Sequence, residues 1–344
     1  MSASYQSILW NRQKKIYDIV ILGLLTLYLA TFIGSSLLRN PEITQETLII
    51  RAFGTLSILL LHIILLIGPL ARLNSAFLPL LYNRRHLGVT TFFCATIHGI
   101  FSIIQFHGLG NRNQVLSVFT SNMHYESLTR FPFQTFGFCA LVILFLMAIT
   151  SHDFWLNMLG PRMWKALHML VYIAYGFIIL HVLLGIIQFE TSPLFVTLLG
   201  MGLLSVIIAH LLSSAQEHRL DQQRPDATHH GFIKICNVDD IPENRAKVVS
   251  VNQERIAIFR YNNKVSAISN VCKHQNGPLG EGRIIDGCIT CPWHGYQYLP
   301  HNGSSPAPFK EKVATYDVKV INREIWINPV PYPEGTERVP AIIN

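Results

Sequence analysis

Cys272-Lys-His274 and Cys291-Pro-Trp-His294 are the segments that decide how this chain is interpreted. A C-x-H pair is followed, after 16 intervening residues, by a C-x-x-H pair. Two thiolates and two neutral imidazoles can hold two irons, one with sulfur ligands and the other with nitrogen ligands. A tetrahedral zinc site is the alternative that the same four residues allow. Turn-forming residues flank both segments, so the sequence predicts two tight loops meeting at one metal centre: Gly277, Pro278, Gly280, Gly282, Gly287 and Gly295.

Residues 231–329 resemble the Rieske ferredoxin domain. The two matching loops read Cys272-Lys-His274-Gln-Asn-Gly-Pro-Leu and Cys291-Pro-Trp-His294-Gly-Tyr. The resemblance implies a 2Fe-2S cluster with two cysteine ligands on one iron and two histidine ligands on the other. It also implies an antiparallel β-fold for this part of the chain.

The surroundings of this cluster differ from those in the high-potential, quinol-oxidising Rieske proteins. Their extra disulfide-forming cysteines are absent, and Tyr296 stands where they usually carry a serine that hydrogen-bonds a bridging sulfur. Fewer hydrogen bonds to sulfur imply a lower reduction potential. Tyr298 occupies the place of their tyrosine, which implies an intermediate value. Cys288 is not needed as a ligand and is expected to be a small buried side chain.

The composition indicates a membrane protein. Half of the residues are apolar, only 14% are charged, and the mean hydropathy is positive. The net charge is +7, but the sequence contains no basic stripe interleaved with aromatic residues, so nucleic acid is not an expected partner. An apolar portion runs to about Ser213 and a polar portion follows it, which indicates two domains in different solvents.

Six apolar segments have about the 20 residues that a helix needs to cross a bilayer. We therefore predict a six-helix transmembrane bundle followed by an all-β Rieske domain. The predicted spans are Ile16 to Leu38, Leu48 to Leu70, Leu87 to Phe106, Phe133 to Thr150, Ala166 to Gln188 and Leu194 to Leu212.

The distribution of Lys and Arg predicts the orientation. Ten of them lie near span ends on one side, against four on the other, which places both termini in the cytoplasm of a bacterial-type inner membrane. The first span is expected to be retained, because its apolar run is too long for a signal peptide. Thiolate ligands survive in the reducing cytoplasm, and structural disulfides are not expected there.

The polar portion divides into a linker, a β domain and a tail. The predicted boundaries are 1–213 for the haem-binding transmembrane domain, 214–230 for an exposed linker that permits domain movement, 231–330 for the Rieske domain and 331–344 for the tail. Short runs of β-forming residues separated by turn signals predict the strands. They are Phe232 to Cys236, Lys247 to Val251, Arg255 to Tyr261, Val265 to Ser269, Tyr316 to Val320 and Glu324 to Ile327.

Two histidines within the predicted spans lie at similar depths. His98 follows Arg84 by fourteen residues and His181 follows Lys165 by sixteen, and both helices are predicted to run outward. Ionisable residues inside a membrane are functional candidates. The pair could bind one haem iron from both sides, which suits electron transfer rather than oxygen chemistry. Hydrogen bonding to a neighbouring carbonyl is the alternative role of each histidine.

The segments leading to these histidines resemble the ferric-reductase-like transmembrane domain. Arg84-Arg85-His86-Leu-Gly precedes His98, and Trp164-Lys-Ala-Leu-His168 precedes His181. Members of this family include the haem subunit of bacterial methionine sulfoxide reductase systems, NADPH oxidases and ferric reductases. The resemblance implies a b-type haem and adds His168 to His98 and His181 as ligands. A second haem is an alternative that needs His86 or another partner, because Arg84 stands at the family's inner histidine position.

These features predict a transmembrane electron-transfer protein. Electrons would enter the Rieske cluster from a cytoplasmic reductase, pass to the haem and leave to an outer-face or periplasmic acceptor protein or to ferric iron. Quinone is a further candidate partner, and the reverse direction stays open. The chain has no flavin or nicotinamide domain of its own, and the sequence leaves open whether it is an enzyme subunit or an electron carrier. The alternatives are a redox or iron sensor and a membrane-anchored ferredoxin without haem.

Overall fold

The computed structural model describes residues 12–81, 84–190, 192–222, 228–229, 231–252, 254–274, 276–293 and 295–343. These residues form two compact units. The helical unit contains the described residues of Asn11–Leu66 and Arg84–Ile208. The β unit contains the described residues of Ile67–Asn83 and Ala209–Asn344. Each unit is considered separately below.

The apolar portion of the chain folds into helices. They are α1 Arg12–Arg39, α2 Gln45–Leu73, α3 Leu78–Leu81, α4 Arg84–His107, α5 Gln114–Thr120, α6 Phe133–Ile149, α7 Asp153–Met169, α8 Val171–Leu184 and α9 Pro193–Gln222. Three 3-10 turns accompany them: η1 Ser75–Phe77, η2 Leu128–Arg130 and η3 Ile186–Phe189.

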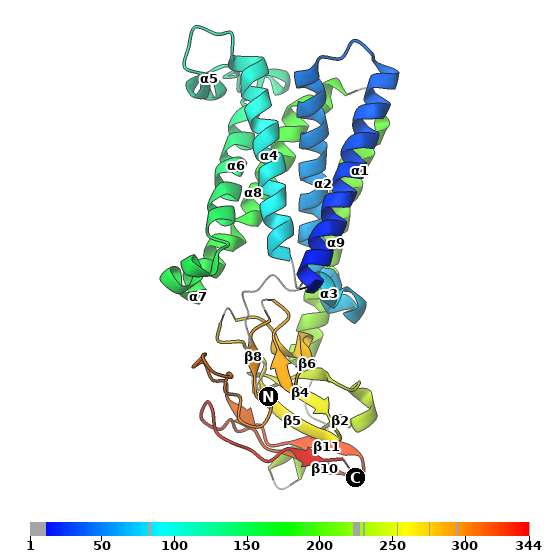
Figure 1. Cartoon of the computed structure of the whole chain (residues 1–344), viewed down its shortest axis with the longest axis vertical. Helices are drawn as coiled ribbons and strands as arrows, with labels where there is room; N and C mark the ends of the chain where they lie inside the picture. Colours follow the sequence, from blue (N-terminus) through cyan, green and yellow to red (C-terminus); the bar gives the residue numbers. More distant parts are fainter. Residues whose placement is uncertain are drawn as a thin grey trace. The chain divides into compact units, whose positions relative to one another are not determined.

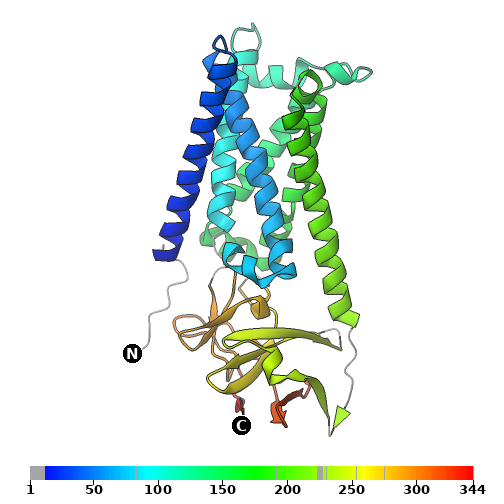
Figure 2. The same cartoon turned by 90° about the vertical axis from the view of Figure 1, so that its right-hand side faces the viewer.

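Neighbouring helices of the helical unit lie side by side. Helices α4 and α6 run alongside each other in Figure 1, and their packing includes Phe92 against Phe145, with ring centroids 5.8 Å apart. Helices α1 and α2 are neighbours in Figure 1 and Figure 2. The Tyr28 hydroxyl on α1 donates to Thr55 Oγ1 on α2 at 2.8 Å. A hydrogen bond to a neighbouring helix gives the hydroxyl a partner where water is absent.

Five helical segments are long and apolar enough to span a membrane: Lys15–Arg39, Gln45–Leu73, Arg84–His107, Met163–Gln188 and Pro193–Gln222. The protein is therefore a multi-pass membrane protein. The remaining predicted span forms α6, which has 17 residues and is shorter than the five. The count of six crossings stays a prediction.

The span predicted at Ala166 to Gln188 is interrupted. Helix α7 ends at Met169, α8 begins at Val171, and the 3-10 turn η3 completes the segment. His168 thus belongs to α7, whereas His181 belongs to α8. The two histidines do not share one regular helix.

The polar portion forms strands and two further 3-10 turns. They are β1 Thr228–His229, β2 Phe232–Asn237, η4 Val238–Asp240, β3 Arg245–Val251, β4 Glu254–Tyr261, β5 Lys264–Ser269, η5 Leu279–Glu281, β6 Arg283–Ile285, β7 Cys288–Thr290, β8 Gln297–Tyr298, β9 Thr315–Tyr316, β10 Val318–Ile321, β11 Glu324–Ile327 and β12 Ala341–Ile342. Five of the six predicted strand segments are confirmed. The segment predicted at Tyr316 to Val320 is instead divided between β9 and β10, which belong to different sheets, and the short strands around the metal motifs were missed.

These strands form three antiparallel sheets. One has the order β1-β2-β11-β10, and a second has the order β12-β5-β4-β3 with β9 also paired to β5. The third, β6-β7-β8, contains the turn that carries Cys291. Two apolar cores lie in this unit, and Cys272 and Cys291 both belong to the second, beside Leu279 and Tyr298.

The predicted linker is wrong over its first part. Helix α9 continues past Ser213 to Gln222, so residues 214–222 are helical rather than an exposed loop. Residues 223–227 and 230 of that segment lie outside the described residues. The predicted tail also takes part in the fold, because β12 pairs with β5 and Ile343 is buried in the first core of the unit.

Candidate metal centres

The two loops that carry the predicted cluster ligands have the same backbone design. In the first, Cys272 N–H donates to the Gly277 carbonyl at 2.9 Å, and Asn276 N–H donates to the Cys272 carbonyl at 2.7 Å. In the second, Cys291 N–H donates to the Tyr296 carbonyl at 2.8 Å, and Gly295 N–H donates to the Cys291 carbonyl at 2.9 Å. Each cysteine therefore sits at the start of an equivalent hydrogen-bonded turn.

Both turns require a left-handed residue at the same place. Asn276 has φ 56° and Gly295 has φ 73°, and each lies four positions after its cysteine. Asn and Gly are the residues that adopt this conformation at the lowest cost. The local sequence thus explains why both loops close.

The loops meet at Gly277. A Cβ added to this residue would lie 2.9 Å from Cys291 Sγ and 3.1 Å from Trp293 Cδ2, so the first loop approaches the second too closely for a larger residue. Cys272 and Cys291 are 1% and 2% exposed. The structure therefore brings the two predicted thiolate ligands into one buried region.

His274 contacts the second loop. Its ring stacks on Tyr296, with ring centroids 4.8 Å apart and an angle of 11° between the ring planes. His294 lies outside the described residues. In the part of the chain that the structure describes, no three His, Cys, Asp or Glu side chains converge on one point.

Tyr298 hydrogen-bonds the first ligand loop. Its hydroxyl accepts the N–H of Lys273 at 3.0 Å and lies 3.4 Å from Cys272 Sγ. A metal-bound thiolate has no proton, so the hydroxyl would donate to sulfur. Burial beside Cys272 raises the pKa of Tyr298, which keeps it a donor. The sequence pointed to this tyrosine through its family position.

Tyr296 serves a different purpose from the serine whose place it takes. Its hydroxyl donates to the Glu311 carboxylate, and its ring packs on His274 and on Phe309. Burial, together with this carboxylate, raises the pKa of Tyr296. Because the hydroxyl is committed to Glu311, we assign Tyr296 to the orientation of the His274 imidazole rather than to the cluster sulfurs.

A second pair of candidate ligands lies in the helical unit. His98 on α4 and His181 on α8 have ring centroids 6.2 Å apart and planes at 83°. His98 Nδ1 bonds the Ile50 carbonyl at 2.9 Å, and His181 Nδ1 bonds the Phe133 carbonyl at 2.9 Å. A carbonyl only accepts, so Nδ1 carries the proton in both rings and Nε2 is the nitrogen available to a metal.

A glycine on a neighbouring helix makes room for each imidazole. A Cβ on Gly54 would lie 2.8 Å from His98 Nδ1, and a Cβ on Gly137 would lie 2.7 Å from His181 Nδ1. Neither glycine was predicted as a site residue. Each stands in a Phe-Gly dipeptide, Phe53-Gly54 and Phe136-Gly137, four residues after the accepting carbonyl, and this repeated dipeptide is the signal that could have found them.

The two histidines are held by a duplicated arrangement. Ile50, Gly54 and His98 correspond to Phe133, Gly137 and His181 when 83 is added to each number. In both sets the carbonyl lies 48 residues before the histidine. The sequence showed no repeat of fixed period, because only a few positions of the helix pairs α2 with α4 and α6 with α8 carry the correspondence.

The two rings offer a metal the same kind of donor atom. Each has its Nε2 available, and His98 and His181 would hold a haem iron through these nitrogens. Neutral imidazoles with hydrogen-bonded Nδ1 atoms are the state that axial haem ligands require. The donor set therefore fits a haem.

Both parts of the chain match known protein families. Residues 53–179 match the family model described as ferric reductase like transmembrane component. The heme-binding subunit MsrQ of protein-methionine-sulfoxide reductase from Herminiimonas arsenicoxydans is 33% identical over 159 residues, which are 45% of this chain and 68% of that protein. The chain belongs to the MsrQ family of ferric-reductase-like membrane proteins.

The MsrQ subunit of Ralstonia nicotianae is 34% identical over 131 residues, which cover 38% of this chain and 55% of that protein. Residues 231–317 match the Rieske [2Fe-2S] domain. The ferredoxin subunit of anthranilate 1,2-dioxygenase from Burkholderia cepacia is 28% identical over 92 residues, 26% of this chain and 85% of that protein. This MsrQ-family chain is thus a fusion of a ferric-reductase-like membrane domain with a Rieske domain.

The two other histidines named in the sequence analysis of this MsrQ-family chain, His168 and His86, make contacts of their own. His168 stacks on Trp164 with centroids 3.8 Å apart, and its Nδ1 bonds the Trp164 carbonyl at 3.0 Å. His168 Nε2 is buried without a hydrogen-bond partner among the described residues. His86 pairs with Asp18, with Nδ1 2.8 Å from Oδ2. The structure does not join these two histidines to one centre.

Proposed function

We propose that this protein transfers electrons across the membrane, from a cytoplasmic donor through the Rieske cluster to one b-type haem held by His98 and His181, and on to an outer-face acceptor. The observation that carries the proposal is the approach of these two imidazoles at 6.2 Å with both Nδ1 atoms bonded to carbonyls. A cluster and a haem, when bound, supply one-electron transfer.

The chain's own residues position and insulate these groups. Cys272, His274, Cys291 and His294 would hold the cluster, and the Tyr298 hydroxyl would donate to the Cys272 sulfur. Ile50 and Phe133 orient the two membrane imidazoles and set their tautomer. His168, whose Nε2 is buried without a described hydrogen-bond partner, is kept as a candidate for a second, cytoplasm-side haem.

The direction and the partners follow from the proposed topology. Six crossings with both termini cytoplasmic would place the Rieske domain with cytoplasmic reductases. The relatives named as heme-binding subunits of protein-methionine-sulfoxide reductase support such a reductase as the acceptor, and the proposed topology would place it at the outer face. Ferric iron is the alternative acceptor, and membrane quinone is the alternative donor. The absence of a described pairing between His86 and His168 favours one haem over two.

The test is cofactor analysis of the full chain in detergent. Iron, haem and the low-temperature EPR spectrum of the dithionite-reduced protein are measured for the natural protein and for His98→Ala, His181→Ala and His210→Ala. We expect about two non-haem irons and one haem per chain. Haem should be lost in the first two variants and retained in His210→Ala, whose histidine lies on α9.

The outcomes separate the candidate functions. A Rieske signal without haem would reduce the helices to an anchor for a ferredoxin. Two haems per chain would assign the second to His168 and a new partner. If both cofactors are present but no electrons pass from reduced cluster to haem in stopped-flow measurements, the redox-sensor function replaces the proposed one.

A further inference from the structure

The end of α9 presents two carboxylates on one face. Glu217 and Asp221 are four residues apart in a helix that continues to Gln222, and residues at this spacing are neighbours on a helix surface. The sequence assigned both to a linker. As part of a regular helix they form a fixed acidic pair.

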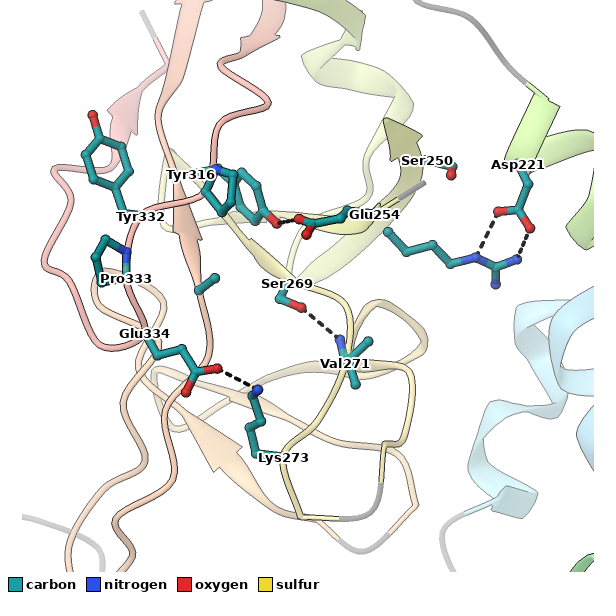
Figure 3. A pocket seen from close by; sticks show the side chains of 13 residues that line it. Asp221, Ser250, Glu254, Ser269, Val271, Lys273, Tyr316, Tyr332, Pro333 and Glu334 are labelled. Carbon is teal, nitrogen blue, oxygen red and sulfur yellow. Dashed lines mark hydrogen bonds and ion pairs between the residues drawn. The ribbon is translucent and has the colours of Figure 1, made fainter. Parts of the chain in front are cut away.

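Arg255 on β4 binds both carboxylates. Its Nε donates to Asp221 Oδ1 at 2.9 Å and its Nη2 donates to Asp221 Oδ2 at 2.7 Å, while Nη1 donates to Glu217. Figure 3 shows Asp221 joined to the guanidinium by two parallel bonds. The hydrogen bonds to Asp221 and Glu217 raise the pKa of Arg255. A two-point arginine–carboxylate contact is stronger and more directional than a single surface ion pair.

A second set of contacts reaches the end of α2. Gln216 Nε2 donates to the Arg72 carbonyl at 3.2 Å, and Arg72 Nε lies 3.5 Å from Glu281 Oε1 on η5. The turn η5 lies between the two predicted ligand loops in the sequence. The ends of both helices are thereby tied to the sheet and to the loop region, and all of these residues belong to the β unit.

The same contacts border the cluster region. Asp221 and Arg255 line a cleft together with Lys273, the residue that follows Cys272. Lys273 Nζ lies 2.5 Å from Glu334 Oε1, and the Tyr316 hydroxyl donates to Glu254 at 2.9 Å, as Figure 3 shows. The charged groups of this cleft are therefore paired within the protein, and a bound ligand is not needed to neutralise them.

We propose that Arg255 is a positioning residue that anchors the end of α9 to the sheet of the Rieske domain, so that residues 214–222 stay an ordered helical part of the β unit instead of forming a flexible linker. The anchor consists of Arg255 with Glu217 and Asp221, supported by Gln216, Arg72 and Glu281. This proposal does not depend on the proposed direction of electron flow, and its test does not require electron transfer.

The test is hydrogen–deuterium exchange of residues 213–222 in the full chain, analysed as a double-mutant cycle. Arg255→Glu and Asp221→Arg should each raise exchange of this segment about tenfold, a factor that corresponds to about 1.4 kcal/mol. The double variant Arg255→Glu with Asp221→Arg should recover most of the protection. Raising the salt concentration should increase the exchange rate of residues 213–222 in the natural protein, because salt screens the ion pairs. The increase should be smaller in the Arg255→Glu variant.

The control is another arginine–aspartate pair in the same unit, in which one arginine nitrogen contacts both carboxylate oxygens. Arg323 Nη2 donates to Asp239 Oδ1 at 2.7 Å and to Oδ2 at 3.0 Å. Arg323→Glu should leave exchange of residues 213–222 unchanged. The visible and EPR spectra of the cluster, retained in every variant, show that the domain has folded.

The inference is overturned if Arg255→Glu leaves exchange of the α9 end at the natural rate, or if Arg323→Glu raises it equally. It is also overturned if the charge-swapped double variant exchanges as fast as the single variants. A protein that shows the anchor but fails to reduce its haem would contradict only the proposed function.

Discussion

The two candidate centres of this chain hold their ligands by different means. In the cluster loops, each cysteine is fixed by backbone bonds to residues four and five positions further along. In the helical unit, each histidine is fixed by a carbonyl 48 residues away on another helix. A lipid-embedded helix has no loop with which to wrap a ligand, so a neighbouring helix must supply both the acceptor and the space. The comparison shows why one site has a compact motif and the other does not.

Removing a ligand gives the largest expected effect, and it should differ between the two regions. Cys291→Ser should abolish the EPR signal of the reduced cluster and open both loops, because metal binding contributes to the folding of such loops. His181→Ala should remove haem while the helical circular dichroism is kept, since helix packing does not depend on that ring. Retention of the cluster in Cys291→Ser would contradict the assignment of Cys291 as a cluster ligand.

The room that Gly54 and Gly137 leave for the imidazoles should affect haem occupancy nearly as much as the histidines themselves. Gly137→Ala places a methyl group 2.7 Å from His181 Nδ1, which is too close for van der Waals contact, so the imidazole has to move. Overpacking of this kind costs about 1–3 kcal/mol, enough to lower haem occupancy roughly tenfold. Haem per chain by the pyridine haemochrome method is the measurement.

Gly176→Ala on α8 is the control, because nothing lies within 4 Å of its added Cβ. It should keep full haem occupancy. If both alanine variants bind haem equally well, the glycine spaces have no part in holding the ligands.

The β unit contains a charge network in which the carboxyl group of Glu281 should titrate near neutral pH. Burial raises the pKa of Glu281 to about 7, with Glu217 adding to the increase and Arg72 and Arg255 opposing it. When the pKa of an acid is higher in the folded protein than in the unfolded chain, ionisation favours the unfolded chain. The free energy of unfolding therefore falls as pH rises from about 4.5 to about 7, by up to about 3 kcal/mol. Glu281→Gln should therefore unfold at a higher temperature than the natural protein at pH 8.

The difference in unfolding temperature should shrink toward pH 5, where Glu281 is protonated in the folded protein. Loss of cluster absorbance on heating follows the transition. Glu337→Gln changes an exposed carboxylate and serves as the control. A constant difference between pH 5 and pH 8 would show that Glu281 is already ionised across this range.

The smallest effect sharpens the comparison within the cluster site. Tyr298→Phe removes the hydroxyl that lies 3.4 Å from Cys272 Sγ. A hydrogen bond to a charged group is worth about 1.5 kcal/mol, so the potential of the cluster should fall by about 60 mV for one electron. Tyr296→Phe should shift the potential less, because its hydroxyl bonds Glu311. Equal shifts in protein-film voltammetry would contradict the separate roles of the two tyrosines.

Local patterns predicted the elements that local physics decides. Alternating β-forming residues located β2, β3, β4, β5 and β11, and long apolar runs located the five spanning segments. The short strands β6, β7 and β8 were missed, because a strand of two or three residues has no periodicity and is held by its neighbours. Residues 214–222 were mistaken for a linker because they are polar, although a polar helix can be held by Arg255 and by other side chains.

The sequence by itself predicted the chemistry of this protein: four candidate cluster ligands in two spaced pairs, two histidines at similar depths in apolar segments, and a membrane part joined to a β domain. These features depend on residue type and spacing. Only the tertiary structure decided that Gly54 and Gly137 make room for the histidines, that Tyr296 turns to Glu311, and that Arg255 binds the end of α9. Each of these contacts joins side chains or backbone groups that only the packing of the folded chain brings together.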